Sequence, residues 1–227
     1  MLQQFGPSLY STEGPAISFF GFVYPTRMAA ARLADGSLWV WSPVALTDGL
    51  AAEVRTLGPV RYIVAPNALH HLFLHEWARR WPDALLYAPP GLARKKPALH
   101  FAAELGEEPD PAWLGDIDQA VFRGSIALRE VVFFHRPSRT AIFGDLIQRF
   151  PAAQARGWRG ALMRLDGLVG EHGSTPREWR ASFLRRSAAR AARAKVLAWS
   201  AERLLIAHGA CVDRGAAATI ESALAWI

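Results

Sequence analysis

Short apolar runs separated by Gly, Pro and polar residues fill the first part of the chain, and their periodicity predicts alternating strands and helices. Asp35-Gly36 lies between two such runs and is typical of a hairpin turn, so these runs predict paired strands. Leu69, Phe73 and Trp77 recur at helical spacing until Pro82 ends the pattern. The elements predicted here are strands within 18–24, 29–33, 38–41, 60–66 and 84–91, and helices at 47–58 and 69–81.

After a polar segment rich in Pro and Gly at about 91–114, which we expect to be a connecting segment, the second half repeats this order. Thr175, Pro176 and Glu178 have the spacing of a capping box and predict the start of a helix. The elements predicted here are strands within 119–124, 130–135, 140–145 and 203–209, a turn at 136–139, and helices at 152–169, 176–200 and 215–227. The repetition predicts an α/β (α+β) fold with two sheets face to face and helices outside, in halves of about 1–90 and 115–227.

Composition narrows the class of protein. The 227 residues are 51% hydrophobic, which provides a large core and excludes a disordered chain. The single cysteine, Cys211, excludes an intramolecular disulfide and a zinc finger, and it favours a reducing compartment. The first twenty residues lack the features of a signal peptide, and no window reaches the roughly 18 apolar residues of a membrane span. We therefore expect a cytoplasmic protein without a membrane span.

The net charge of +6 is concentrated near the end of the chain. Seven basic residues fall in one predicted helical stretch, at positions 177, 180, 185, 186, 190, 193 and 195. Such a stretch is a candidate for docking on nucleic acid or an anionic membrane. The basic residues are spread around the helix and alternate with alanine, which favours a solvated helix face instead. We do not expect nucleic acid as a partner.

Metal-ligand side chains follow buried strands at three places, where α/β folds tend to form binding sites. They are the adjacent pair His70-His71, Asp145 and His208. Histidine and carboxylate are common ligands of zinc, iron and manganese, and three protein ligands with an open position are what a catalytic zinc requires. A histidine pair at a helix start is, however, more often a capped, hydrogen-bonded structural element than a set of metal ligands.

Two further histidines, His75 and His135, lie in predicted secondary-structure elements. His75 lies four residues after His71, but the glutamate of the two-histidine zinc helix is missing, so we expect His75 at the surface. His135 ends a predicted strand and either faces the same cleft or bonds to the neighbouring turn.

Two long segments resemble a known family. "APNALHHLFLHEWARRWPDALLYAPPG" and "EVVFFHRPSRTAIFGDL", together with the strand ends "FGD" and "AHG", are similar to the metallo-β-lactamase fold superfamily and to its DUF4336 branch. The resemblance implies one domain over residues 1–227, with the αβ/βα four-layer sandwich of the metallo-β-lactamase type. It also implies a metal-dependent hydrolase acting on a small ester, lactone, amide or phosphoester.

The superfamily's motif His-x-His-x-Asp-His is only half present. The resemblance places His71 at its last histidine and His70 at its aspartate, and a one-residue shift between the two stays open. Asn67 falls near the first histidine, and no imidazole near Ser125 supplies another. Asp145 matches the bridging aspartate and His208 the final histidine. These residues imply at most one ion.

We therefore expect one ion, Zn (or Fe/Mn), held by His71, Asp145 and His208, with His70 as a further ligand. Asp145 and His71 are the candidate catalytic residues, with Asp145 as base or ligand, and Asn67 and His135 are expected to contact the ligands from outside. The expected partner is a small-molecule substrate; substrate identity and oligomeric state stay open. The alternative is a non-catalytic protein of the same fold, with a degenerate metal site, that serves as a binding or scaffold protein.

Overall fold

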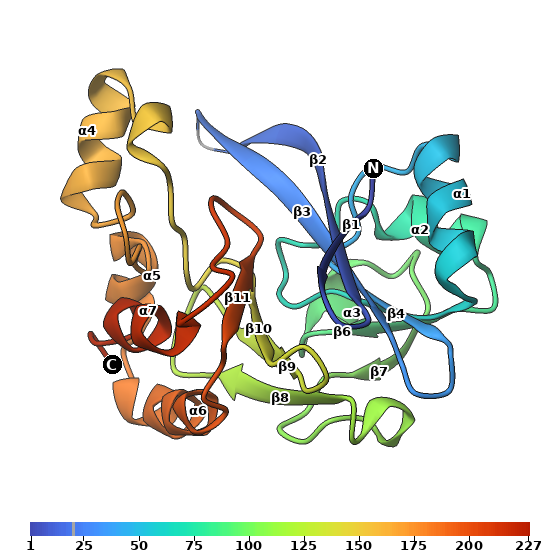
Figure 1. Cartoon of the computed structure of the whole chain (residues 1–227). Coiled ribbons are helices and arrows are strands. Elements are labelled where there is room, and N and C mark those ends of the chain that lie inside the picture. The colour runs from blue at the N-terminus through green and yellow to red at the C-terminus, as the bar shows by residue number, and fades with distance from the viewer. Residues whose placement is uncertain (20) are drawn as a thin grey trace.

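Two β-sheets lie face to face, and helices cover their outer sides (Figure 1). The computed structural model describes residues 1–19 and 21–227. Within that part of the chain, the first sheet has seven strands in chain order, and the second has four in the order β11-β10-β9-β8. The first sheet consists of β1 (Gln3–Gly6), β2 (Leu9–Phe19), β3 (Phe22–Arg32), β4 (Leu38–Trp41), β5 (Val60–Val64), β6 (Leu85–Ala88) and β7 (Phe101–Glu104). The second consists of β8 (Ile117–Phe122), β9 (Glu130–His135), β10 (Thr140–Phe143) and β11 (Arg203–Ile206).

Apolar side chains fill the space between the layers. Trp39 and Phe133, from opposite sheets, meet edge to face with ring centroids 5.0 Å apart. The helices of the first half are α1 (Asp48–Leu57), α2 (Leu74–Arg80) and α3 (Leu92–Lys95), and those of the second are α4 (Gly157–Leu165), α5 (Arg177–Ser182), α6 (Arg186–Ala198) and α7 (Ala216–Ala223). Trp77 of α2 and Ile220 of α7 belong to the apolar clusters outside the first and second sheets. The fold is therefore the predicted four-layer αβ/βα sandwich.

The first hairpins and α1 agree with the predicted pattern. β3 and β4 pair antiparallel around the Asp35-Gly36 turn, where Gly36 has a φ of +83°. Thr47 accepts a hydrogen bond from the Leu50 N–H at 3.1 Å, and α1 ends before Gly58 as predicted. The apolar run at 18–24 spans the end of β2 and the start of β3, and its Phe20 lies outside the described residues.

The helix predicted for 69–81 begins five residues late, because α2 starts at Leu74. Asn67 Oδ1 accepts a hydrogen bond from the Leu69 N–H at 2.9 Å, and His71 Nδ1 donates to the Ala68 carbonyl at 2.8 Å. Such local side-chain to backbone bonds hold the chain in turns instead of a helix. The histidine pair therefore lies in a turn ahead of α2.

Three predictions for the chain after residue 90 need correction. The segment at 91–114 is more than a connection, because it contains α3 and the edge strand β7. The helix predicted for 176–200 is divided into α5 and α6, since Phe183 pairs with Ser125 and the Arg185 N–H donates to the Gly124 carbonyl. The helix predicted for 152–169 is shorter, with α4 preceded by a 3-10 turn at Ala152–Gln154.

The predicted capping box is absent from the start of α5. Thr175 Oγ1 instead donates to the Leu146 carbonyl at 2.6 Å and accepts a hydrogen bond from Trp226 Nε1 at 2.8 Å. Pro176 occupies the N-cap position, where no side chain caps the helix. Thr175 thus joins the last residues of the chain to the segment after β10.

The basic residues of α6 bond mainly to the end of the chain. Arg186, Arg190 and Arg193 donate to the backbone carbonyls of Trp226, Ile227 and Leu224, respectively. Cations next to the terminal carbonyls of a helix stabilise it. These contacts give the arginines a structural role. Within the described residues, no helix has the length and apolar character needed to cross a membrane.

Strand direction brings the candidate residues to one edge of the sandwich. β4 and β5 run parallel, and so do β10 and β11. Ser42 and Asn67 follow the first pair of strands, and Asp145 and His208 follow the second. Because parallel strands present their carboxyl ends at the same edge, residues far apart in the sequence meet there.

Candidate metal centre

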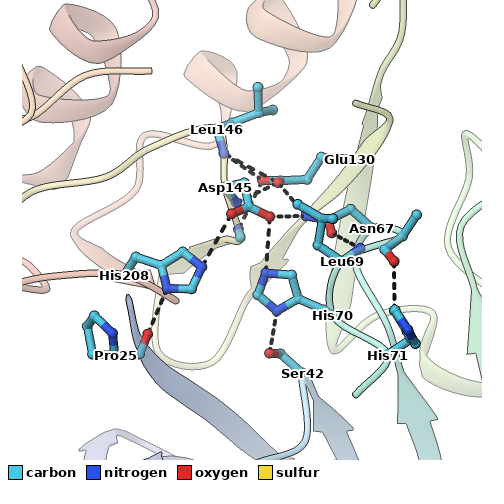
Figure 2. Close-up of polar contacts among 12 residues, drawn as sticks. Pro25, Ser42, Asn67, Leu69, His70, His71, Glu130, Asp145, Leu146 and His208 are labelled. Carbon is cyan, nitrogen blue, oxygen red and sulfur yellow. Dashed lines mark hydrogen bonds and ion pairs between the residues drawn. The ribbon is translucent and has the colours of Figure 1, made fainter. Parts of the chain in front are cut away.

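The side chains of His70, Asp145 and His208 converge at this edge (Figure 2). His70 Nε2 lies 3.2 Å from Asp145 Oδ2, and His208 Nε2 lies 3.3 Å from Asp145 Oδ1. One ligand atom from each residue lies within 4.8 Å of the other two. Asp145 and His208 are only 5% and 6% exposed, so the group is nearly removed from water. We call these three residues the cluster.

Each histidine of the cluster is oriented through its other ring nitrogen. His208 Nδ1 donates to the Pro25 carbonyl at 2.7 Å, and His70 Nδ1 lies 2.6 Å from Ser42 Oγ. A carbonyl only accepts, so Nδ1 of His208 carries the proton. Nε2 of His208 therefore either carries a second proton or directs a lone pair toward the centre of the cluster. Metal-binding histidines are commonly oriented in this way.

The charges of the cluster stabilise one another. Burial alone would raise the pKa of Asp145, but hydrogen bonds from His208 and His70 hold it well below its usual range. Burial would lower the pKa of His208, yet the Asp145 carboxylate raises it above its ordinary value. Asp145 is therefore an ionised carboxylate with both oxygens directed at the histidines.

A second buried carboxylate, Glu130, supports Asp145 from behind (Figure 2). Its oxygens accept hydrogen bonds from the backbone N–H groups of Gly144 at 2.9 Å and Asp145 at 2.6 Å. Asn67 donates from Nδ2 to Glu130 Oε2 at 2.9 Å and to Asp145 Oδ2 at 2.8 Å. Burial, and then the negative charge of Asp145, raise the pKa of Glu130 to about 7. Asn67 thus links the two carboxylates and holds Asp145 in place.

Backbone shape also fixes the cluster. A Cβ atom on Gly144 would lie 2.9 Å from Glu130 Oε2 and 3.0 Å from Asn67 Nδ2, so a glycine lets these groups approach the loop. On the other side, Arg27 Nη1 donates to the carbonyls of Ile206 and Gly209, at 2.5 Å and 2.8 Å. Those two residues flank the segment that carries His208. Both sides of the cluster are therefore held by hydrogen-bonded backbone.

The structure places His71 outside the cluster. Its ring lies to one side in Figure 2, with Nδ1 donating to the Ala68 carbonyl. Burial lowers the pKa of His71 below its ordinary value, which favours the neutral ring with Nε2 as an acceptor. The expectation that His71 is a better ligand than His70 therefore needs correction, because the turn after Asn67 directs His70 toward Asp145 instead.

The other singled-out histidines have separate surroundings. His135 is fully buried, with Nδ1 2.7 Å from Ser138 Oγ, so it bonds to the turn after β9 and does not join the cluster. Of the two alternatives predicted for His135, facing the cleft or bonding to the neighbouring turn, the structure shows the bond to the turn. His75 is exposed, as predicted. Cys211 is partly buried and packs against the apolar clusters of the core.

A cavity of about 700 Å³ opens next to the cluster, and all three cluster residues line it. His71, Tyr24 and Gln148 also face it. Burial, and then the negative charge of Glu178, raise the pKa of Tyr24 to about 12, so its hydroxyl stays protonated. The volume is that of a small-molecule site.

Comparison of the sequence with known protein families identifies the family of this chain. The profile of the family described as "Domain of unknown function (DUF4336)" matches residues 16–157, more than half of the chain. The chain belongs to the DUF4336 family. No curated protein matches it at a significant level. The matched range of this DUF4336 chain contains His70 and Asp145, whereas His208 lies beyond it.

Solved structures establish the fold of this DUF4336 protein. The DIM-1 metallo-β-lactamase exposed to ceftazidime is 15% identical, with a TM-score of 0.64 over 98% of this chain and 95% of that chain. A metallo-β-lactamase from Pontibacter korlensis is 13% identical, with a TM-score of 0.63 over 99% and 98%. The FIM-1 enzyme from Pseudomonas aeruginosa in its mono-zinc form is 14% identical, with a TM-score of 0.62 over 98% and 93%. The sandwich is therefore of the metallo-β-lactamase type, as predicted.

The residues present in this DUF4336 protein fit one metal ion. With metal–ligand lengths near 2.0–2.2 Å, neighbouring ligand atoms of a tetrahedral site lie roughly 3.3–3.6 Å apart. His70 and His208 lie 3.2 Å and 3.3 Å from different oxygens of Asp145, and one ligand atom from each of the three residues lies within 4.8 Å of the other two. Two imidazoles and one carboxylate form a donor set that suits zinc or non-haem iron. The cluster could therefore hold a metal.

Sequence reasoning missed two residues that support the cluster, Glu130 and Ser42. Glu130 begins the strand "EVVFFH", and a carboxylate at the start of a fully buried strand is a signal that could have identified it. Ser42 follows β4 with a φ of +49°, a conformation rare for residues other than glycine. Only the fold reveals that both lie next to residues from distant strands.

Proposed function

We propose that this protein is a metal-dependent hydrolase that uses one divalent ion, held by His70, Asp145 and His208, on a small ester, lactone, amide or phosphoester. The observation that carries the proposal is the convergence of three ligand atoms within 4.8 Å at the edge of a small-molecule cavity. Three protein ligands leave a fourth tetrahedral position open to water and substrate. We propose zinc first, with iron or manganese as the other candidates.

The roles of the side chains follow from their contacts. A bound ion would supply Lewis acidity, which polarises a carbonyl or phosphoryl oxygen and acidifies water. Asp145 has both oxygens directed at histidines and accepts a hydrogen bond from Asn67, so we assign it as a ligand and not as a base. His71 lines the cavity, and because its Nδ1 donates to the Ala68 carbonyl, Nε2 is the acceptor of the neutral ring. We assign His71 as the group that accepts a proton from attacking water.

The fold supports this proposal by analogy alone. The similar structures are described as metallo-β-lactamases, and FIM-1 was solved in a mono-zinc form. Those properties belong to those proteins. Here they make hydrolysis with one ion the first hypothesis to test.

Metal content and activity, measured on the same variants, test the proposal. The wild type should contain about one equivalent of transition metal by elemental analysis and hydrolyse members of an ester, lactone, amide and phosphoester panel. His70→Ala and His208→Ala should lose both metal and activity. His71→Ala should keep the metal and lose about 100-fold or more in kcat, the usual contribution of a general base. His75→Ala, at an exposed site, is the matched control and should keep both.

A non-catalytic scaffold is the competing function, and one observation favours it. The cluster residues already pair with one another, so protonated histidines could satisfy the Asp145 carboxylate without any metal. A protein that takes up no zinc, iron or manganese on reconstitution would establish this alternative. A protein that binds metal but hydrolyses nothing in the panel would reject the catalytic part of the proposal.

A further inference from the structure

The cavity beside the cluster has mainly apolar walls contributed by distant segments. Figure 1 shows the long hairpin of β2 and β3 reaching toward α4, and residues from both elements line the cavity. The turn that carries His70 and His71 supplies a further wall. The larger apolar residues that face the cavity include Leu69, Phe73, Phe150, Leu162, Met163 and Trp179. A ligand that fills this space buries apolar surface, at roughly 25 cal/mol per Å².

The charges on the cavity walls disfavour an anion away from the cluster. Arg27 is the one arginine or lysine among the described lining residues, and its guanidinium is occupied by two carbonyls and by Glu13 at 2.6 Å. Two carboxylates, Asp166 and Glu178, also line the cavity. Asp166 pairs with Arg177 at 3.2 Å. Within the described chain, the Glu178 side chain makes no hydrogen bond or ion pair, so its negative charge is not compensated.

We propose that the part of the substrate lying away from the cluster is an uncharged apolar group, an alkyl chain or an aromatic ring, and that Glu178 disfavours substrates with an anionic substituent there. This inference depends on the proposed function in one respect: the reacting group of the substrate is taken to lie at the cluster. Like charges repel, so an anionic substituent placed beside Glu178 binds less tightly than an uncharged group of the same size. The selected class is therefore acyl or aryl esters, lactones and amides without a distal carboxylate, phosphate or sulfate.

Binding of two matched ligands tests the inference without requiring turnover. The probes are octanamide and the same eight-carbon amide with a carboxylate at its far end, measured by calorimetry on the full-length protein as purified. Octanamide should bind about tenfold or more tightly than the carboxylate. Glu178→Gln should strengthen binding of the carboxylate several-fold and leave octanamide unchanged. Glu178 is exposed, so this change should not disturb the fold.

Two leucines of α4 provide a matched pair that locates the binding site. Leu162 lines the cavity, whereas Leu165 on the same helix does not, and they are 45% and 62% exposed. Leu162→Ser should weaken binding of octanamide several-fold, and Leu165→Ser should not change it. The inference is overturned if neither probe binds, if the carboxylate binds as tightly as octanamide to the wild type, or if the two serine variants behave alike.

Elemental analysis of the same samples separates this inference from the proposed function. A protein that shows the expected binding pattern but holds no metal keeps the apolar site and loses the hydrolase proposal. A protein that holds metal and hydrolyses substrates but prefers the carboxylate keeps the hydrolase proposal and loses this inference.

Discussion

Glu130 Oε2 lies 2.6 Å from the backbone nitrogen of Asp145, and Oε1 of the same carboxylate accepts a hydrogen bond from the Gly144 N–H. A buried acid thus shapes the loop that presents a candidate ligand. In Glu130→Gln, an NH2 group replaces one carboxylate oxygen. That group donates hydrogen bonds and cannot accept one from the backbone N–H groups of Gly144 or Asp145. We expect a loss of about 2–4 kcal/mol in the free energy of unfolding, because buried groups would be left without partners. Urea unfolding measures this change.

The exposed Glu104 provides the control for Glu130. It accepts a hydrogen bond from the Gly91 N–H at 2.8 Å, so Glu104→Gln makes the same chemical change outside the site. It should alter stability by less than about 1 kcal/mol. Metal affinity should fall about 10–100-fold in Glu130→Gln alone. Equal effects of the two variants would show that Glu130 has no special part in the site.

Gly144→Ala should destabilise the protein by about 1–3 kcal/mol and reduce metal content. The added methyl group would lie 2.9 Å from Glu130 Oε2 and 3.0 Å from Asn67 Nδ2, and both groups are hydrogen-bonded and buried. Gly106→Ala is the control, since a Cβ atom there would meet nothing within 4 Å. Thermal unfolding of both variants checks the prediction, and an unchanged Gly144→Ala protein would contradict the tight packing of the loop.

Gln148→Leu should separate stability from ligand binding. Gln148 lines the cavity, and its Oε1 atom is buried without a hydrogen-bond partner in the described structure. Replacing a buried unpartnered amide by an apolar side chain of similar size should keep stability or raise it by about 1 kcal/mol. We expect KM for amide or ester substrates to rise several-fold, because the amide group is available to bond a substrate. An unchanged KM would remove Gln148 from the substrate site.

His135 should make stability depend on pH. Burial lowers its pKa from 6.5 to about 4, so between these values the unfolded chain binds a proton that the folded chain excludes. Stability should therefore fall as the pH decreases from about 6.5 to 4, by at most about 3 kcal/mol from this group. His135→Leu should show a shallower fall over the same range in urea unfolding at several pH values. Parallel curves for the two proteins would contradict the assignment.

Much of the fold could be predicted from the sequence because its local signals agree with the packing. The Asp35-Gly36 turn, the Thr47 cap and the apolar strand before His135 each appear where periodicity places them. The edge strand β7 could not be predicted, because its apolar run is only three residues long, from Phe101 to Ala103, and lies in a polar segment rich in Pro and Gly. The break between α5 and α6 depends on Phe183 pairing with Ser125, a contact that only the folded chain contains.

The candidate site was predicted in part. Asp145 and His208 follow buried strands, and the structure brings them together as expected from that position. The motif favoured His71 with a one-residue shift left open, and the structure places His70 beside Asp145 because hydrogen bonds at Asn67 and His71 keep this segment in a turn. Asn67 was expected to contact the ligands from outside, and it does contact Asp145. Organisation as a single domain of two repeated halves stays a prediction.

The hydrogen bonds of Thr175 bear on the order in which the protein is made. They join the loop after Asp145 to Trp226, and the cluster also needs His208 from the last strand. Ribosomes deliver a chain from its N-terminus, so the first sheet is available long before these partners exist. The cluster can therefore form only after the segment that carries His208 has left the ribosome.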